Sequence, residues 1–219
     1  MYKRQDVNVT INNDIVLSKV QQNTVLYDKT GEQHYDIISA FIKSIRGSDP
    51  NAAVYYLARM VEGGEDVKFI ARRLIIAASE DIGNANPTAL VIANNCFQAV
   101  NTIGYPEARI ILSQCVTYLA SSPKSNASYM AIKKAQQLVK QTGHLPIPLS
   151  LRNAPTALMK EIGYGDDYKY SHDYPNNFAT QEFLPENIKG TKIYEPGNSS
   201  REQAIRSELK SKWKEKYGY

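Results

Sequence analysis

Residues 36–66, DIISAFIKSIRGSDPNAAVYYLARMVEGGED, contain two amphipathic helical patterns separated by helix-breaking residues. Gly47 ends the first pattern, and Asp49 and Pro50 supply an N-cap and a first helical residue for the second, which Gly63 closes. The apolar positions of the first pattern fall on one face of a helix: Ile37, Ile38, Phe41, Ile42 and Ile45. This stretch predicts a helical hairpin.

The same pattern continues on the C-terminal side of this hairpin. Helices are expected at 65–82, 88–103, 107–119 and 126–141, with short links that contain Gly, Pro, Asp or Asn. No sustained alternation of apolar and polar residues indicates a strand. Helices of this length joined by short loops predict an all-α fold, an antiparallel helical bundle over 28–144.

The composition changes after His144. Prolines at 146 and 148 exclude a helix there, and only two further helices are expected, a short one over 155–162 and a charged one over 202–217. The final helix carries an apolar stripe of Ala204, Ile205, Leu209 and Trp213. Between these helices the chain is irregular and rich in tyrosine. Residues 145–219 are therefore expected to wrap over the bundle or over a neighbouring subunit, as part of the same unit.

The overall composition is that of an ordinary globular protein. The 219 residues carry a net charge of +4, which permits contact with nucleic acid but does not demand it. Cys96 and Cys115 lie in apolar helical surroundings, which favours buried free thiols in a reducing compartment. The start lacks the apolar core of a secretory signal, and no run of about 18 apolar residues predicts a membrane span. A cytoplasmic, nucleoid-associated location without membrane contact is expected.

The sequence offers no recognisable catalytic site. It lacks the Gly-x-x-x-x-Gly-Lys-Ser/Thr loop that binds nucleotide phosphates, and it lacks Cys-x-x-Cys and His-Glu-x-x-His zinc motifs. His34, His144 and His172 have no Ser or Cys nucleophile motif to accompany them. No catalytic, cofactor-binding or metal-binding residue is predicted.

Pairs of basic residues are the candidates for nucleic-acid contact. Arg72 and Arg73 lie on one predicted helix, and Lys133 and Lys134 lie on another. Such residues neutralise phosphates without regard to base sequence, and nearby tyrosines can stack on unpaired bases. The alternative is that amphipathic helices place Lys and Arg on their solvated faces in any case.

Several longer strings resemble the RarA/MgsA family, the replication-associated recombination protein A group, which includes the Werner helicase-interacting protein. The strings lie between about residues 24 and 195, and the most specific are the following: YDKxGExHYD (27–36), ISAFIKSIRGSDP (38–50), AxYYLARMxEGGED (53–66), AxSEDIGxANP (77–87), LxLRNAPT (149–156) and HDYPNNF (172–178).

The resemblance implies a region from the C-terminal half of a AAA+ ATPase that acts at stalled replication forks. Residues 1–27 would be the end of the ATPase lid, and 28–144 would be a clamp-loader-like domain that assembles a homotetramer. ATP and Mg would bind in an ATPase module outside this sequence, so no enzyme activity is expected of the fragment. The implied partners are other copies of the chain and DNA, either single-stranded or with forks and ends.

The irregular tail supplies the candidates for the oligomer interface: Leu149, Arg152, Tyr174, Pro175 and Phe178. An extended aromatic tail is difficult to bury within one subunit, and packing against copies would bury it. Two alternatives remain at this point. The tail can cover its own bundle, or the region can be a docking platform for a replication protein such as single-strand-binding protein.

Overall fold

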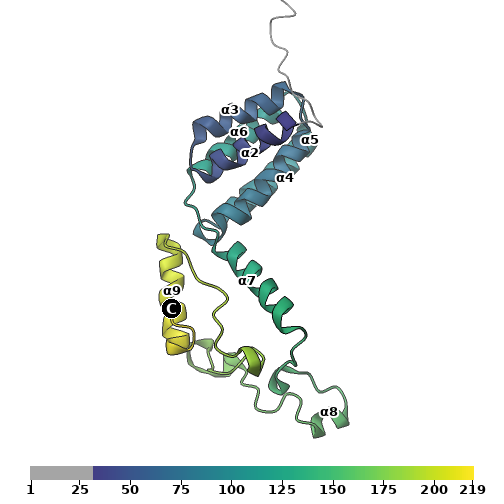
Figure 1. Cartoon of the computed structure of the whole chain (residues 1–219), viewed down its shortest axis with the longest axis vertical. Helices are drawn as coiled ribbons and strands as arrows, with labels where there is room; N and C mark the ends of the chain where they lie inside the picture. Colours follow the sequence, from purple (N-terminus) through teal and green to yellow (C-terminus); the bar gives the residue numbers. More distant parts are fainter. Residues whose placement is uncertain (1–31) are drawn as a thin grey trace, which may run out of the picture.

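The structure, a computed structural model, describes residues 32–219. Five of its helices pack together as the bundle at the top of Figure 1: α2 (Glu32–Arg46), α3 (Pro50–Glu62), α4 (Val67–Ala77), α5 (Thr88–Ile103) and α6 (Ala108–Ser121). Helix α6 is central, since it packs against each of the other four. No strand occurs among residues 32–219, so the all-α prediction is confirmed for that part of the chain.

The sequence signals account for the helix ends in the bundle. The Asp49 carboxylate accepts a hydrogen bond from the amide of Ala52 at 3.0 Å, and Pro50 occupies the first helical position. Asp66 caps α4 in the same way. Helix α5 ends where Gly104 adopts a φ of 69°, a conformation that disfavours any residue with a Cβ.

The bundle core contains the residues that the apolar spacing predicts. The five-residue stripe of α2 is buried throughout, and Phe41 and Ile45 have no exposed surface. Leu74, Leu112, Val116 and Leu119 complete the centre of the core. Cys96 and Cys115 are buried free thiols, as predicted.

The helix predicted over 65–82 differs from the structure at its C-terminal end. The α-helix stops at Ala77 and continues as a π-helical turn, Ala78–Ile82, followed by a 3₁₀ turn, Gly83–Ala85. A wider turn of this kind cannot be read from apolar spacing, because it changes the hydrogen-bond register rather than the pattern of buried side chains.

Helix α7 (Ala127–Thr142) leaves the bundle and projects away from it (Figure 1), although the sequence predicted one bundle extending to 144. The irregular segment begins at its far end and contains the short helix α8 (Ala157–Glu161), inside the predicted 155–162. The chain then returns along α7 to α9 (Ser200–Trp213), which is followed by a 3₁₀ turn, Lys214–Lys216, in place of the predicted helical end at 217.

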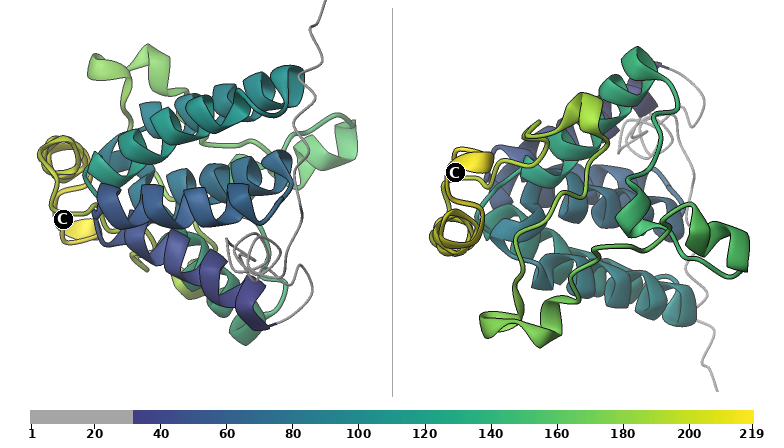
Figure 2. Two further views of the ribbon diagram at one scale, coloured as in Figure 1. Left: turned by 90° about the horizontal axis from the view of Figure 1, so that it is seen from above. Right: turned by 90° about the horizontal axis from the view of Figure 1, so that it is seen from below.

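The tail meets the bundle at one corner instead of covering it. The N-terminal end of α9 contacts the 3₁₀ turn Gly83–Ala85, and the helix runs away from the bundle from there (Figure 1). The views along the long axis place the tail beneath the five helices (Figure 2). Residues 1–27, predicted to end the ATPase lid, lie outside the described residues, and the division of the chain into domains stays a prediction.

Candidate functional site

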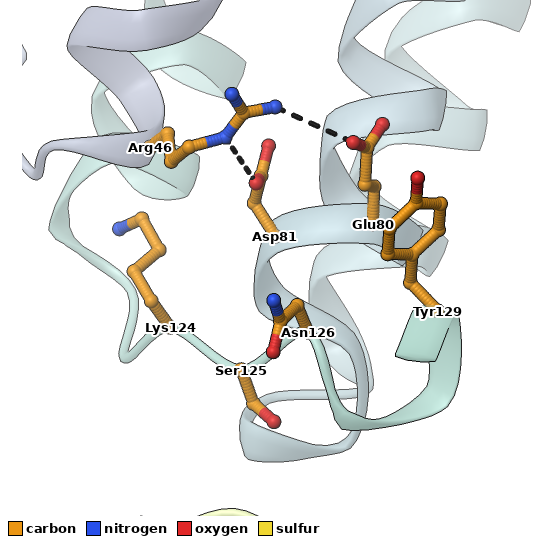
Figure 3. Close-up of a pocket in the computed structure, with 7 residues that line it drawn as sticks. All are labelled: Arg46, Glu80, Asp81, Lys124, Ser125, Asn126 and Tyr129. Atoms are coloured by element: carbon orange, nitrogen blue, oxygen red, sulfur yellow. Dashed lines mark hydrogen bonds and ion pairs between the residues drawn. The ribbon is translucent and has the colours of Figure 1, made fainter. Parts of the chain in front are cut away.

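An ion-pair cluster joins the end of α2 to the π-helical turn (Figure 3). Arg46 Nε donates to Asp81 Oδ1 at 2.5 Å, and Arg46 Nη2 lies 3.4 Å from Glu80 Oε1. Asp81 is buried, and its second oxygen Oδ2 has no hydrogen-bond partner. The bond to Asp81 raises the pKa of the Arg46 guanidinium above its ordinary value. Arg46 is therefore the ion-pair partner that compensates most directly for the charge of Asp81.

The link between α6 and α7 lines the other side of this cluster and forms a cavity of about 460 Å³ with it. Lys124 Nζ donates to the carbonyls of Leu119, Ala120 and Ser122 at 2.6–3.1 Å, which satisfies the C-terminal end of α6. Burial lowers the pKa of the Lys124 ammonium below its ordinary value. The lysine is thus used as a helix cap, and its charge is already engaged.

Ser125 joins the bundle, α7 and α9. Its amide donates to the Asp81 carbonyl at 2.8 Å, and its hydroxyl donates to Glu202 Oε1 at 2.7 Å. Glu202 has no exposed surface, and its second oxygen accepts from the N-cap Ser199 at 3.0 Å. The two serine hydroxyls and the helix N-terminus stabilise this buried carboxylate. Ser125 consequently fixes where both α7 and the tail leave the bundle.

Helix α7 faces the returning segment 192–195 on one side, although Met130 on that side is still 47% exposed. Ala127, Met130 and Ala131 face the returning segment 192–195 across a cavity of about 530 Å³. The opposite face carries residues at spacings of three, four and three, which places them in one row. We call this row the open seam: Tyr129, Ile132, Gln136 and Val139. Its apolar members are 42%, 56% and 58% exposed. Among the 16 residues of α7, only Ala127 is buried.

The four basic residues predicted to contact phosphates lie on two different helices, α4 and α7. Lys133 and Lys134 line the cavity beside α7, together with Lys192, which the sequence did not single out. Lys134 donates to the Lys192 carbonyl, and Lys192 pairs with Glu195, so part of this charge is compensated. Arg72 and Arg73 lie on α4 in the bundle, with the Arg72 guanidinium 5.7 Å from the centre of the Phe69 ring.

The five predicted interface residues divide into two groups. Leu149, Tyr174 and Pro175 are exposed. Arg152 and Phe178 contact other residues of the tail in the same subunit. Arg152 donates to the Ile147 carbonyl at 2.8 Å and to the Tyr164 hydroxyl at 3.0 Å.

Phe178 packs edge-on against Trp213 of α9, with ring centres 5.2 Å apart. Phe183 and Tyr217 contact the same indole, at 6.1 Å and 5.3 Å. This aromatic cluster attaches the irregular segment to α9. Phe178 and Phe183 lie 35 and 30 residues before Trp213, so no local spacing pattern could predict their contacts with it.

Residues 32–219 contain no group of three or more His, Cys, Asp and Glu side chains arranged to hold a metal ion. Within the same residues, none of the helices combines the length and apolar character that crossing a membrane requires.

Comparison with known families accounts for both parts of the sequence. The family described as MgsA AAA+ ATPase C terminal matches residues 47–213, and the family described as AAA C-terminal domain matches residues 1–46. The boundary between these two matches falls after Arg46, the last residue of α2.

Curated relatives match most of this chain. Replication-associated recombination protein A of Coxiella burnetii is 47% identical over 84% of this chain and 42% of its own length. The Escherichia coli K12 protein of that name is 41% identical over 86% and 42%. ATPase WRNIP1 of Dictyostelium discoideum is 42% identical over 83% and 22%. The chain thus spans less than half the length of these relatives, and it belongs to the MgsA AAA+ ATPase C-terminal family.

Proposed function

We propose that this chain is the self-association and DNA-handling region of a AAA+ ATPase that acts in DNA replication, recombination and repair at stalled forks. ATP and Mg would be bound by the parent protein's ATPase module. The role of this chain would be to bring several such ATPase modules together around DNA. Work at the chromosome places it, on this proposal, in the cytoplasm beside the nucleoid.

The exposed helix α7 carries the self-association proposal. A 16-residue helix with a single buried residue and a row of exposed apolar side chains gains little from its own subunit. Apolar surface of this kind on a projecting element is typical of protein interfaces. A homotetramer is the assembly that the family resemblance implies.

The solution mass of the chain tests this proposal. Light scattering across a dilution series is expected to give a stable species near four times 24.6 kDa. A species of 24.6 kDa at all micromolar concentrations would show that the chain does not assemble by itself.

DNA contact is supported by a separate observation, the grouping of Lys133, Lys134 and Lys192 beside α7. Replacing Lys133 and Lys134 by Ala should reduce the slope of log affinity for single strands against log salt by about 1.4, from roughly 0.7 per phosphate contact. Lys43 and Lys68, exposed on α2 and α4, provide a matched control pair. Arg72→Ala with Arg73→Ala tests the other predicted pair in the same assay.

An equal slope for the Lys133 and Lys134 variant and for the control would remove these two residues from the proposal.

The tail supports the second candidate function, a docking platform for a replication protein such as single-strand-binding protein. Tyr168, Tyr170 and Phe183 are 41–55% exposed there. Replacing these three with Ser should abolish capture of single-strand-binding protein in a pull-down if the tail is the platform.

A further inference from the structure

The open seam of α7 continues onto the bundle. Ile75 and Ile76 of α4 lie beside Tyr129 and Ile132 of α7, and these side chains line a groove of about 500 Å³. Ile76 is 45% exposed. Together the seam and the groove form one apolar surface that spans the junction between the bundle and the projecting helix.

The border of this surface carries two lysines on α7 and one carboxylate in the groove, Glu80, which is paired with Arg46. Helix α7 contains no Asp or Glu. Lys140 lies next to the seam, and Lys133 lies between the seam and the cavity that faces residues 192–195. Both lysines are exposed, and neither is within ion-pair distance of a carboxylate among residues 32–219. An occupant of the seam should therefore be apolar or aromatic and negatively charged at its edge.

One segment of the chain has that chemistry. Residues 161–174, which we call the acidic aromatic loop, hold four carboxylates against one lysine, Lys169. The carboxylates are all exposed, and none has an ion-pair partner among residues 32–219: Glu161, Asp166, Asp167 and Asp173. Tyr168, Tyr170 and Tyr174 alternate with them and are 48%, 55% and 40% exposed.

We propose that the open seam of one copy binds the acidic aromatic loop of a second copy. This inference rests on the proposed self-association and names the two surfaces that would meet. Tyrosines would fill the apolar groove, and the carboxylates would face Lys133 and Lys140. A symmetric α7–α7 contact is disfavoured, because it would bring lysines of both copies together without any acidic residue on either helix.

A contact between two different surfaces is heterologous, so each copy uses its seam for one neighbour and its loop for another. Repetition of such a contact produces a closed ring when the rotation between copies closes, and a filament when it does not. A closed ring of four copies would agree with the expected homotetramer.

The first experiment compares the full chain with Ile132→Glu and with Ile110→Glu by light scattering at one concentration. Ile132 and Ile110 are 56% and 60% exposed, but Ile110 lies on α6 of the bundle, outside the seam. Ile132→Glu should fall to 24.6 kDa, whereas Ile110→Glu should keep the unsubstituted mass. Circular dichroism of both variants establishes that they remain folded.

The outcomes separate the two proposals. A monomeric unsubstituted chain overturns both self-association and this inference. An unsubstituted assembly that survives Ile132→Glu overturns the seam as an interface and leaves self-association standing. If Ile132→Glu loses single-stranded DNA binding and keeps its assembled mass, the seam is a DNA surface and the proposed occupant is wrong.

Charge reversal then identifies the occupant. Lys133→Glu with Lys140→Glu, and separately Asp166→Lys with Asp173→Lys, should each weaken assembly at least tenfold. An equimolar mixture should recover it, because the reversed seam can bind the reversed loop and the native seam the native loop. Full assembly of the Asp166 and Asp173 variant by itself would exclude the acidic aromatic loop, and a mixture that stays dissociated would exclude direct pairing of the two surfaces.

Discussion

Replacement of Arg46 by Met is expected to destabilise the bundle by about 2 kcal/mol. The substitution keeps most of the apolar stem of the side chain and removes the charged group that bonds Asp81 at 2.5 Å. A hydrogen bond to a charged group contributes about 1.5–3 kcal/mol, and a buried polar group without a partner costs about 1–3 kcal/mol. The Arg46 side chain is 47% exposed, so water can replace part of the lost interaction. The expected destabilisation therefore lies in the lower half of the range of about 1.5–3 kcal/mol for a hydrogen bond to a charged group.

Urea unfolding followed by circular dichroism measures this effect, since most helical residues lie in the bundle and α7. Arg109→Met is the matched control, because Arg109 is exposed on α6 and pairs with no carboxylate among residues 32–219. It should change the free energy of unfolding by less than about 0.5 kcal/mol.

A double-mutant cycle separates the ion pair from other effects of the substitution. Asp81→Asn removes the charge that Arg46 compensates, so the double variant should be more stable than the sum of the single losses predicts, by about 1 kcal/mol or more. Additive losses, or a loss in Arg46→Met no larger than in Arg109→Met, would refute the view that Arg46 compensates for the charge of Asp81.

Three further outcomes can be checked on the same chain. Leu112→Ala should cost about 2–5 kcal/mol in urea unfolding, because Leu112 has no exposed surface, whereas Ile110→Ala should cost under about 0.5 kcal/mol; equal losses would contradict the described core. Ser125→Ala should lower the unfolding midpoint reported by the fluorescence of Trp213, the single tryptophan, because the buried Glu202 loses a donor; Ser128→Ala, which leaves Glu202 untouched, is the control. A hydrogen bond from Lys192, and then one from Arg206, lower the pKa of Glu195 below its ordinary 4.5, so the stability it contributes is present above pH 4.5 and is lost as the pH falls through the folded-state pKa. The stability difference between the unsubstituted chain and Glu195→Gln should therefore shrink below pH 4.5, and a difference that stays constant down to pH 3 would contradict this assignment.

The helices of the bundle could be predicted from the sequence because local signals specify them. The residues over 88–103 form α5 with the predicted bounds, since Gly104 provides the positive φ at its end. The end of α4 was predicted less well, because the π-helical turn is associated with Asp81, whose partner Arg46 is 35 residues away. Local patterns carry no information on such long-range pairs.

The tail shows the same limit more clearly. The predicted apolar stripe of α9 is at most half-buried, and Ala204 is exposed. The fully buried residue of that helix is Glu202, whose carboxylate accepts a hydrogen bond from Ser125. Ser125 lies 77 residues earlier in the sequence, so no local pattern could reveal this contact. Of the candidate site residues, Phe178 was predicted as an interface contact and packs on Trp213 of its own subunit. Whether the exposed Leu149, Tyr174 and Pro175 contact another copy stays a prediction.

The position of α2 has a mechanical consequence. One family match ends at Arg46 and the next begins at Gly47, yet Phe41 and Ile45 of α2 are fully buried in the bundle. A close-packed interior resists deformation, so α2 cannot rotate without carrying α3 and α6 with it. Arg46 extends this coupling to Asp81, whose carbonyl is bonded to Ser125 at the root of α7. Torque applied to α2 would therefore be transmitted through the bundle to the projecting helix α7.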